Sequence, residues 1–108
     1  MLNDILSKKI VLESGTEFEK SLEYGGPYEL AIVEYTSGGE EQLFTGLAYD
    51  MYENGHLESY FYVEKGIKQG KYVEFYPNGF VKKKIGYMRK NAVDGYQVEF
   101  FENGNKKI

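Results

Sequence analysis

His56 and the carboxylates near it in sequence, Asp50, Glu53 and Glu58, are the residues of this chain that could do chemistry. Such groups could hold a metal ion, or the imidazole could serve as the base of a Ser/His/Asp triad. However, the chain has one histidine and no cysteine, so no second imidazole and no thiolate completes a metal site. No Gly-x-Ser-x-Gly pattern marks a nucleophile, and the glycines do not predict a phosphate-binding loop. We therefore expect a solvated histidine, no cofactor or metal, and no enzyme activity.

Charge is distributed unevenly along the chain. Residues 1–64 hold 13 acids and three lysines, whereas residues 65–108 hold four acids and ten bases. Residues 21–64 contain nine carboxylates and no lysine or arginine. Scattered carboxylates usually only solubilise a surface, but this depletion of bases would also speed encounter with a basic protein. Both interpretations stay open at the level of sequence.

The elements that must position these residues are predicted by a repeat. The dipeptide Asn-Gly occurs three times, at spacings of 24 and then 25 residues: Asn54-Gly55, Asn78-Gly79 and Asn103-Gly104. Another glycine lies nine residues before the glycine of each dipeptide, and apolar and polar residues alternate on both sides of the dipeptide. Alternation with period two around Asn-Gly predicts β-hairpins with tight type I′ turns. We expect an all-β, antiparallel meander of hairpin repeats.

The register of these hairpins has two solutions. A two-residue turn at Asn78-Gly79 sets Glu74 opposite Lys83, and a three-residue loop sets it opposite Lys82. The longer loop is favoured because it keeps the apolar residues of both strands on one face. In the first hairpin, however, it would place Asp50 opposite Glu58, which is unfavourable.

The amino-terminal half repeats less regularly. Residues 28–45 predict a degenerate hairpin with Ser37-Gly38-Gly39 as its turn, and residues 1–27 an atypical cap. Within the cap, Ile10–Leu12 and Thr16–Leu22 could form short strands, and Asn3 or Asp4 could begin a brief helix that runs to Lys9. The whole chain, 1–108, is thus expected to be one domain, with repeats at 46–69, 70–94 and 95–108. No apolar run suits a signal peptide or a membrane span, so we expect a cytoplasmic protein.

The strings Tyr-Glu-Asn-Gly-His-Leu at 52–57 and Gly-Ile-Lys-Gln-Gly-Lys-Tyr-Val-Glu-Phe-Tyr-Pro-Asn-Gly at 66–79 resemble the MORN-repeat variant family. The resemblance covers residues 46–108 and, faintly, 28–45. It departs where Ala48, Tyr72 and Gln97 replace a tryptophan that is frequent in the family. The resemblance implies a β-hairpin meander. Bacterial members include antitoxin and immunity components, which implies protein binding, and eukaryotic relatives are associated with membrane-linked scaffolding.

Two sets of side chains could form a docking surface on such a sheet. The acids are those of the base-free stretch, and the tyrosines could either stack between repeats or contact a partner, with stacking favoured for any single residue. The full set is Glu34, Glu40, Glu41, Asp50, Glu53, Glu58, Tyr49, Tyr52, Tyr60 and Tyr62.

These observations predict a non-enzymatic binding protein, an immunity or antitoxin protein that neutralises a cognate toxin. An acidic sheet could occupy the basic substrate cleft of a nuclease toxin, and direct nucleic-acid binding is not expected. The alternative is a scaffold that contacts anionic membrane lipids through carboxy-terminal lysines. The chain reaches Ile108 soon after the third turn, so self-association through that edge, or a place in a longer repeat array, is also considered.

Overall fold

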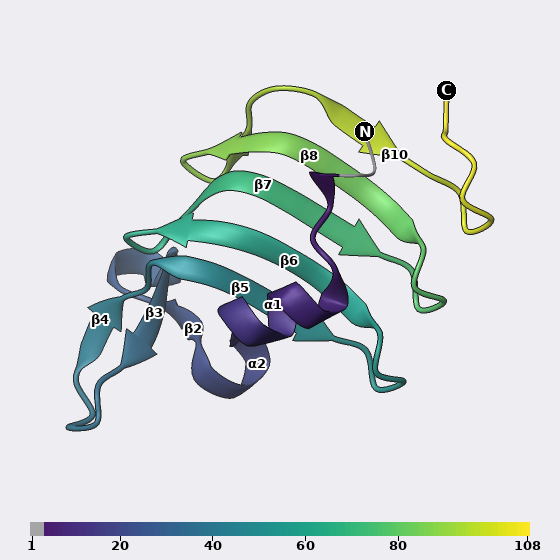
Figure 1. The fold of residues 1–108 in the computed structure, drawn as a ribbon. Helices are drawn as coiled ribbons and strands as arrows, with labels where there is room; N and C mark the ends of the chain where they lie inside the picture. Colours follow the sequence, from purple (N-terminus) through teal and green to yellow (C-terminus); the bar gives the residue numbers. More distant parts are fainter. Residues whose placement is uncertain (1–3) are drawn as a thin grey trace.

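The computed structural model describes residues 4–108, which form two β-sheets and two short helices (Figure 1). Strands hold 50% of the residues and helices 13%, so the predicted mostly-β fold is confirmed. The helices are α1 (Lys8–Ser14) and α2 (Phe18–Ser21), and a 3₁₀ turn spans Pro27–Glu29. The strands are β1 (Thr16–Glu17), β2 (Glu23–Gly25), β3 (Ala31–Tyr35), β4 (Glu41–Leu43), β5 (Gly46–Met51), β6 (Leu57–Glu64), β7 (Ile67–Phe75), β8 (Val81–Arg89), β9 (Ala92–Val93) and β10 (Gln97–Glu99).

The first two Asn-Gly hairpins and the first strand of the third lie side by side in the larger sheet, and the return arm of the third is joined to it by the isolated bridge of Phe100 with Lys106. Its strand order is β1-β5-β6-β7-β8-β10, with β9 paired to β8, and every pairing is antiparallel except that of β1 with β5. The predicted meander is therefore present from Gly46 onward. The degenerate hairpin of residues 28–45 does not join it, because β2, β3 and β4 form a separate three-stranded sheet.

The Asn-Gly turns are three-residue loops, and the predicted type I′ geometry is wrong. Only the glycines have positive φ, +92° at each of Gly55, Gly79 and Gly104, whereas the asparagines do not. In the second loop the Tyr76 N–H donates to the Phe80 carbonyl at 2.8 Å, which closes the loop around Pro77-Asn78-Gly79. A left-handed glycine at the third loop position is the geometry of a three-residue hairpin.

A β-bulge follows each of the first two loops and resolves the register. Phe75 pairs with Val81, as the three-residue loop requires, yet Glu74 pairs with Lys83 and not with Lys82. Lys82 is the extra residue of the bulge, so beyond it each residue of β8 pairs one position later than the three-residue loop alone would place it. In the first hairpin Met51 pairs with Leu57 and Asp50 with Ser59, which leaves Glu58 as the extra residue. The unfavourable pairing of Asp50 with Glu58 therefore does not occur.

The amino terminus covers one face of the larger sheet. We call the face that carries Tyr60 the α1 face, because Val11 of α1 packs there with Leu47, Tyr49 and Tyr60. Residues 4–7, here called the strap, cross the same face before α1 begins (Figure 1). Ser7 caps α1 by accepting from the Ile10 N–H at 3.3 Å, so the helix begins four residues later than a cap at Asn3 predicts and three residues later than a cap at Asp4 predicts. The cap at Asn3 lies outside the described residues, and the strand expected at Ile10–Leu12 is helical.

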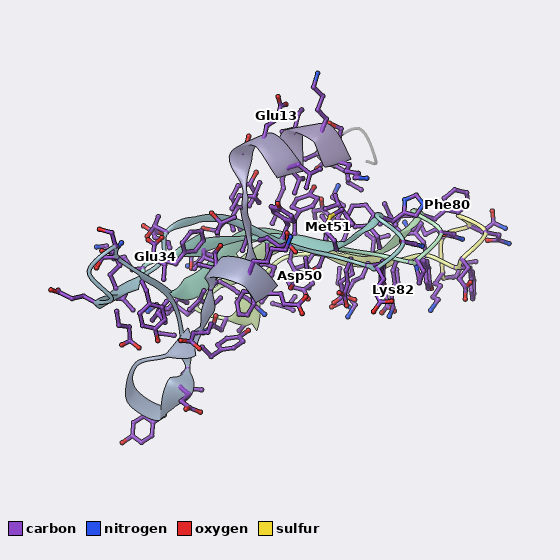
Figure 2. The ribbon with its side chains drawn as sticks, turned by 90° about the horizontal axis from the view of Figure 1, so that it is seen from below. Glu13, Glu34, Asp50, Met51, Phe80 and Lys82 are labelled. Carbon is purple, nitrogen blue, oxygen red and sulfur yellow. The ribbon has the colours of Figure 1, made fainter. Side chains whose placement is uncertain are left out.

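The opposite face, which carries Phe61 and is here called the α2 face, is covered only in part. Phe18 of α2 contacts Phe61 with ring centroids 6.4 Å apart. Ile32 and Phe44, from the smaller sheet and its last loop, complete a core with Ala48. Figure 2 shows α1 on one side of the sheet and α2 with the 3₁₀ segment on the other. Within residues 4–108, neither helix is long and apolar enough to cross a membrane.

Candidate binding surface

A ladder of aromatic residues ties the hairpins together on the α2 face. Each ladder residue directly precedes an Asn-Gly loop. The Tyr52 hydroxyl donates to the Phe75 carbonyl at 2.7 Å, and the Tyr76 hydroxyl donates to the Phe100 carbonyl at 2.8 Å. Each tyrosine thus donates a hydrogen bond to the first arm of the next hairpin, the arm that precedes its Asn-Gly loop. These hydrogen bonds connect neighbouring repeats, which is a different contact from the ring stacking that the sequence favours for any single tyrosine.

Asparagine side chains form a second ladder along the loop tips. Asn54 accepts from the His56 N–H at 3.0 Å and donates from Nδ2 to the Pro77 carbonyl at 2.8 Å. Asn78 repeats both contacts, with the Phe80 N–H at 2.9 Å and the Glu102 carbonyl at 3.0 Å. One amide group thus shapes its own loop and bonds to the next, which no other side chain of that size can do.

The residue three positions after the glycine of each Asn-Gly loop lies beside the aromatic ladder. Lys82 Nζ is 5.8 Å from the ring centroid of Tyr76, and Lys107 Nζ is 5.2 Å from that of Phe101. In the first hairpin the same position holds an acid, Glu58. Burial raises the pKa of Tyr52, and the negative charges of Glu58 and Glu74 raise it further. The charge along this row therefore changes from acidic at the first hairpin to basic at the third.

The acidic end of this row is a cluster centred on Asp50. Partial burial raises the pKa of Asp50, and the charges of Glu58, Glu19 and Glu17 raise it further. The Glu19 N–H, which donates to Asp50 Oδ1 at 3.2 Å, opposes this rise. Mutual repulsion thus destabilises the ionised cluster. We call Glu17, Glu19, Asp50, Glu58 and Glu74 the acidic cluster.

A shallow groove opens beside this cluster on the α2 face. Its volume is about 180 Å³, and its lining is Tyr52, Glu58, Ser59, Tyr72, Glu74, Phe75 and Lys82. The Tyr72 hydroxyl donates to Glu74 Oε2 at 2.9 Å, and burial and this bond strongly raise the pKa of Tyr72. Figure 2 shows Asp50 and Lys82 on the same side of the sheet, with no ribbon over Lys82. Carboxylates in such a groove can accept hydrogen bonds from the lysines and arginines of a partner.

The predicted tyrosines do not form one surface. Tyr49 and Tyr60 are 9% and 0% exposed, and both belong to the core beneath α1. Buried side chains cannot contact a partner, so the prediction that Tyr49 and Tyr60 belong to a docking surface is wrong. Tyr52 belongs to the ladder, and Tyr62 is half-exposed on the α1 face. There it lines an apolar groove of about 450 Å³ with Leu47, Gly70 and Tyr87.

The predicted acids fall into two groups at opposite ends of the strands (Figure 1). Glu34, Glu40 and Glu41 lie on the hairpin of the smaller sheet, where Glu34 accepts from Gln42 Nε2 at 3.2 Å. Asp50 and Glu58 lie in the acidic cluster, and Glu53 is exposed in the first Asn-Gly loop. Only the second group borders the groove of the α2 face.

Sequence reasoning missed three members of the acidic cluster. Glu74 could have been found, because its pairing with Ser59 follows from the hairpin register, and Ser59 also pairs with Asp50. Glu17 and Glu19 carry no such signal. They reach the cluster because β1 pairs in parallel with β5, opposite Ala48 and Tyr49, a contact that no local pattern predicts.

His56 has a packing role in the structure. Its imidazole lies over Gly79, so close that a Cβ there would be 3.1 Å from Nδ1. Among residues 4–108 no group of three or more histidines and carboxylates could hold a metal ion.

Comparison with known proteins finds no matching family model, no matching curated protein and no matching solved structure.

Proposed function

We propose that this chain is a non-enzymatic protein-binding module, and specifically an immunity or antitoxin protein that neutralises a cognate toxin in the bacterial cytoplasm. One observation carries the binding proposal. Five carboxylates gather on a sheet face that α2 and the smaller sheet leave partly uncovered, although burial and repulsion disfavour the ionised form of Asp50. Within the cluster, Glu17 already pairs with Lys20 at 3.6 Å, and a basic partner would relieve the remaining repulsion around Asp50, so the cluster should gain stability on binding. The toxin assignment draws on the resemblance of residues 46–108 to the MORN-repeat variant family.

The partner that fits this surface is a protein with a basic cleft, such as a nuclease. The acidic cluster would replace the phosphates that the cleft otherwise binds. Opposite charges would also steer the encounter, so the association rate should fall as ionic strength rises.

Affinity capture from the source organism, followed by mass spectrometry, would provide the partner. Stopped-flow kinetics with the purified partner would then compare two variants of equal charge. Glu58→Lys with Glu74→Lys places bases in the acidic cluster and should slow association at least tenfold. Glu40→Lys with Glu41→Lys makes the same change on the smaller sheet and should slow it less than threefold. Equal rates for the two variants would refute docking at the acidic cluster.

No observation favours the membrane scaffold over this proposal. Lys84 is buried against Asp4, and Lys107 Nζ lies 4.0 Å from Glu99 Oε1, so two of the lysines that would meet lipid already have acidic neighbours. Sedimentation with anionic vesicles at physiological salt would test the alternative directly. We expect the protein to stay in the supernatant.

A further inference from the structure

An apolar groove lies on the α1 face between the second and third Asn-Gly loops. Its volume is about 380 Å³, and its lining is Gly79, Phe80, Val81, Phe100, Asn103, Gly104 and Asn105. Phe80 packs on Gly104 and is still 48% exposed, and Phe100, which is almost fully buried, also lines the groove. We call this the Phe80 groove.

The repeat provides an equivalent groove one hairpin earlier. There His56 packs on Gly79 as Phe80 packs on Gly104, and Leu57 and Phe75 stand in the places of Val81 and Phe100. That earlier groove holds Leu6 of the strap, with Lys8 at its rim, and only about 130 Å³ remains open. The first site is therefore filled by an extended segment of the chain itself, whereas the second is open.

The contacts of the strap show what chemistry this face accepts. The Leu6 side chain packs against the core, and its N–H donates to the Tyr60 hydroxyl at 2.9 Å. Asp4, two residues earlier, pairs with the buried Lys84 and lies 3.4 Å from Lys71 Nζ. An extended backbone, apolar side chains at Ile5 and Leu6 and a nearby carboxylate are thus the features by which the strap, which leads directly into α1, contacts the α1 face.

The Phe80 groove offers the same combination to a partner. It continues the strap interface without a break, because Gly79 lines both grooves and Val81 packs on the strap's core. Lys106 pairs with Phe100 in an antiparallel bridge, so its side chain projects from the α1 face beside the groove. It is exposed, and among residues 4–108 no carboxylate forms an ion pair with it.

We propose that the Phe80 groove is a second binding site, which takes an extended partner segment carrying a leucine-sized apolar residue close to an acidic one. The apolar side chain would enter between Phe80 and Phe100, and the carboxylate would pair with Lys106. This site lies on the face opposite the acidic cluster. The two sites can therefore be tested, and can fail, independently.

The strap itself supplies the test ligand. A synthetic peptide with the sequence of residues 4–7, Asp-Ile-Leu-Ser, blocked at both ends, would be titrated into the ¹⁵N-labelled full-length chain. We expect saturable shifts of the amide signals of Phe80, Phe100 and Gly104 with millimolar affinity. Replacing leucine by asparagine in the peptide should remove these shifts, and Val81→Phe, which fills the groove, should weaken binding at least fivefold.

Two neighbouring lysines give a matched control for the charge. Lys106→Glu should weaken binding at least threefold, whereas Lys107→Glu, next to it but on the other face, should change it less than 1.5-fold. These variants and the peptide substitution decide the question even if Val81→Phe does not fold. The absence of shifts up to 5 mM peptide would overturn the proposal. Shifts confined to His56 and its neighbours would also overturn the proposal, because the peptide would then be displacing the strap. Shifts that appear when the protein alone is concentrated would overturn it as well, because a second copy of the chain would then fill the groove.

Discussion

The Tyr52 hydroxyl donates to the Phe75 carbonyl, 23 residues further along the chain and in the next hairpin. The Tyr76 hydroxyl makes the equivalent bond to Phe100, 24 residues further on. Such bonds connect neighbouring repeats outside the backbone ladder of the sheet. The third residue of this row is Phe101, which has no hydroxyl. The row therefore separates the contribution of the hydroxyl from that of the ring.

Tyr52→Phe and Tyr76→Phe should each destabilise the fold by about 1 kcal/mol, the usual net contribution of one hydrogen bond. Each change keeps the ring packing and leaves one backbone carbonyl without its donor. Urea denaturation followed by circular dichroism would measure the free energy of unfolding.

The reverse change, Phe101→Tyr, serves as the control. It adds a hydroxyl for which the described chain has no next strand, so the free energy of unfolding should change by less than about 0.5 kcal/mol. If this control stabilised the protein as much as Tyr52→Phe destabilised it, the ladder would not explain the cohesion of the repeats.

The asparagine ladder predicts a difference between turns that look identical in sequence. Asn→Asp keeps the oxygen that shapes the loop and removes the amide donor that reaches the next loop. Asn54→Asp and Asn78→Asp should therefore each cost about 1 kcal/mol through loss of the bonds to Pro77 and Glu102.

Asn103→Asp makes the same chemical change at the third loop. Asn103 keeps the loop-shaping bond to the Asn105 N–H, but its side-chain amide donates to no group of residues 4–108. Thermal unfolding in moderate salt should show a shift for Asn103→Asp well below that of the other two. Equal shifts at all three loops would mean that the added charge dominates.

The sequence predicted the hairpins because the information is local. Asn-Gly and period-two alternation fix a turn and two strands within about twenty residues, and both are confirmed from Gly46 onward. The turn type was wrong because positive φ is needed only at the glycine, while the asparagine works through its side chain. The register was resolved by a bulge, which satisfies the loop length at Phe75 and the pairing of charges at Glu74.

The positions of the functional side chains were less predictable because they depend on distant contacts. Tyr49 and Tyr60 were expected at the surface, yet a helix from the amino terminus covers them. Lys84 occupies the strand position that Tyr60 occupies in the first hairpin and is 1% exposed, and its buried charge is compensated by distant residues, Asp4 and Tyr96. No pattern in residues 4–20 indicates which strand they will cross.

The pair of Asp4 and Lys84 predicts a fold that loses stability in both acid and alkali. Hydrogen bonds to Lys84, then to Lys71, lower the pKa of Asp4, so its contribution is present above the ordinary value of 3.8 and is lost as the pH falls through the lowered pKa. Burial works to lower the pKa of Lys84, but hydrogen bonds to Asp4 and Tyr96 outweigh it and raise the pKa. That contribution is present below 10.5 and is lost as the pH rises through the raised pKa.

Asp4→Asn should remove the acid limb of this profile and lower the melting temperature at pH 7. Lys84→Met should lower the melting temperature less than Asp4→Asn does, because an apolar side chain suits the buried site and Asp4 can still form its ion pair with Lys71. Melting temperatures of both variants between pH 3 and 10 would test this order. A larger loss for Lys84→Met would show that the lysine contributes mainly through Tyr96 and its packing.

Asp50→Asn should stabilise the free protein at neutral pH. Burial and the charges of Glu58, Glu19 and Glu17 raise the pKa of Asp50, so the folded state disfavours the ionised form. The stability of the wild type is then complete below the ordinary value of 3.8 and falls as the pH rises through the raised pKa, whereas the asparagine variant is spared this loss. The gain should be modest, below about 1 kcal/mol because solvent screens the cluster, and it should vanish at pH 3. Thermal unfolding across this range, with Glu53→Gln as the matched removal of an exposed charge, measures it. If Asp50→Asn were less stable than the wild type at pH 7, the hydrogen bond from the Glu19 N–H would outweigh the repulsion between Asp50 and the neighbouring carboxylates. The acidic cluster would then stabilise the fold instead of being a binding site for a basic partner.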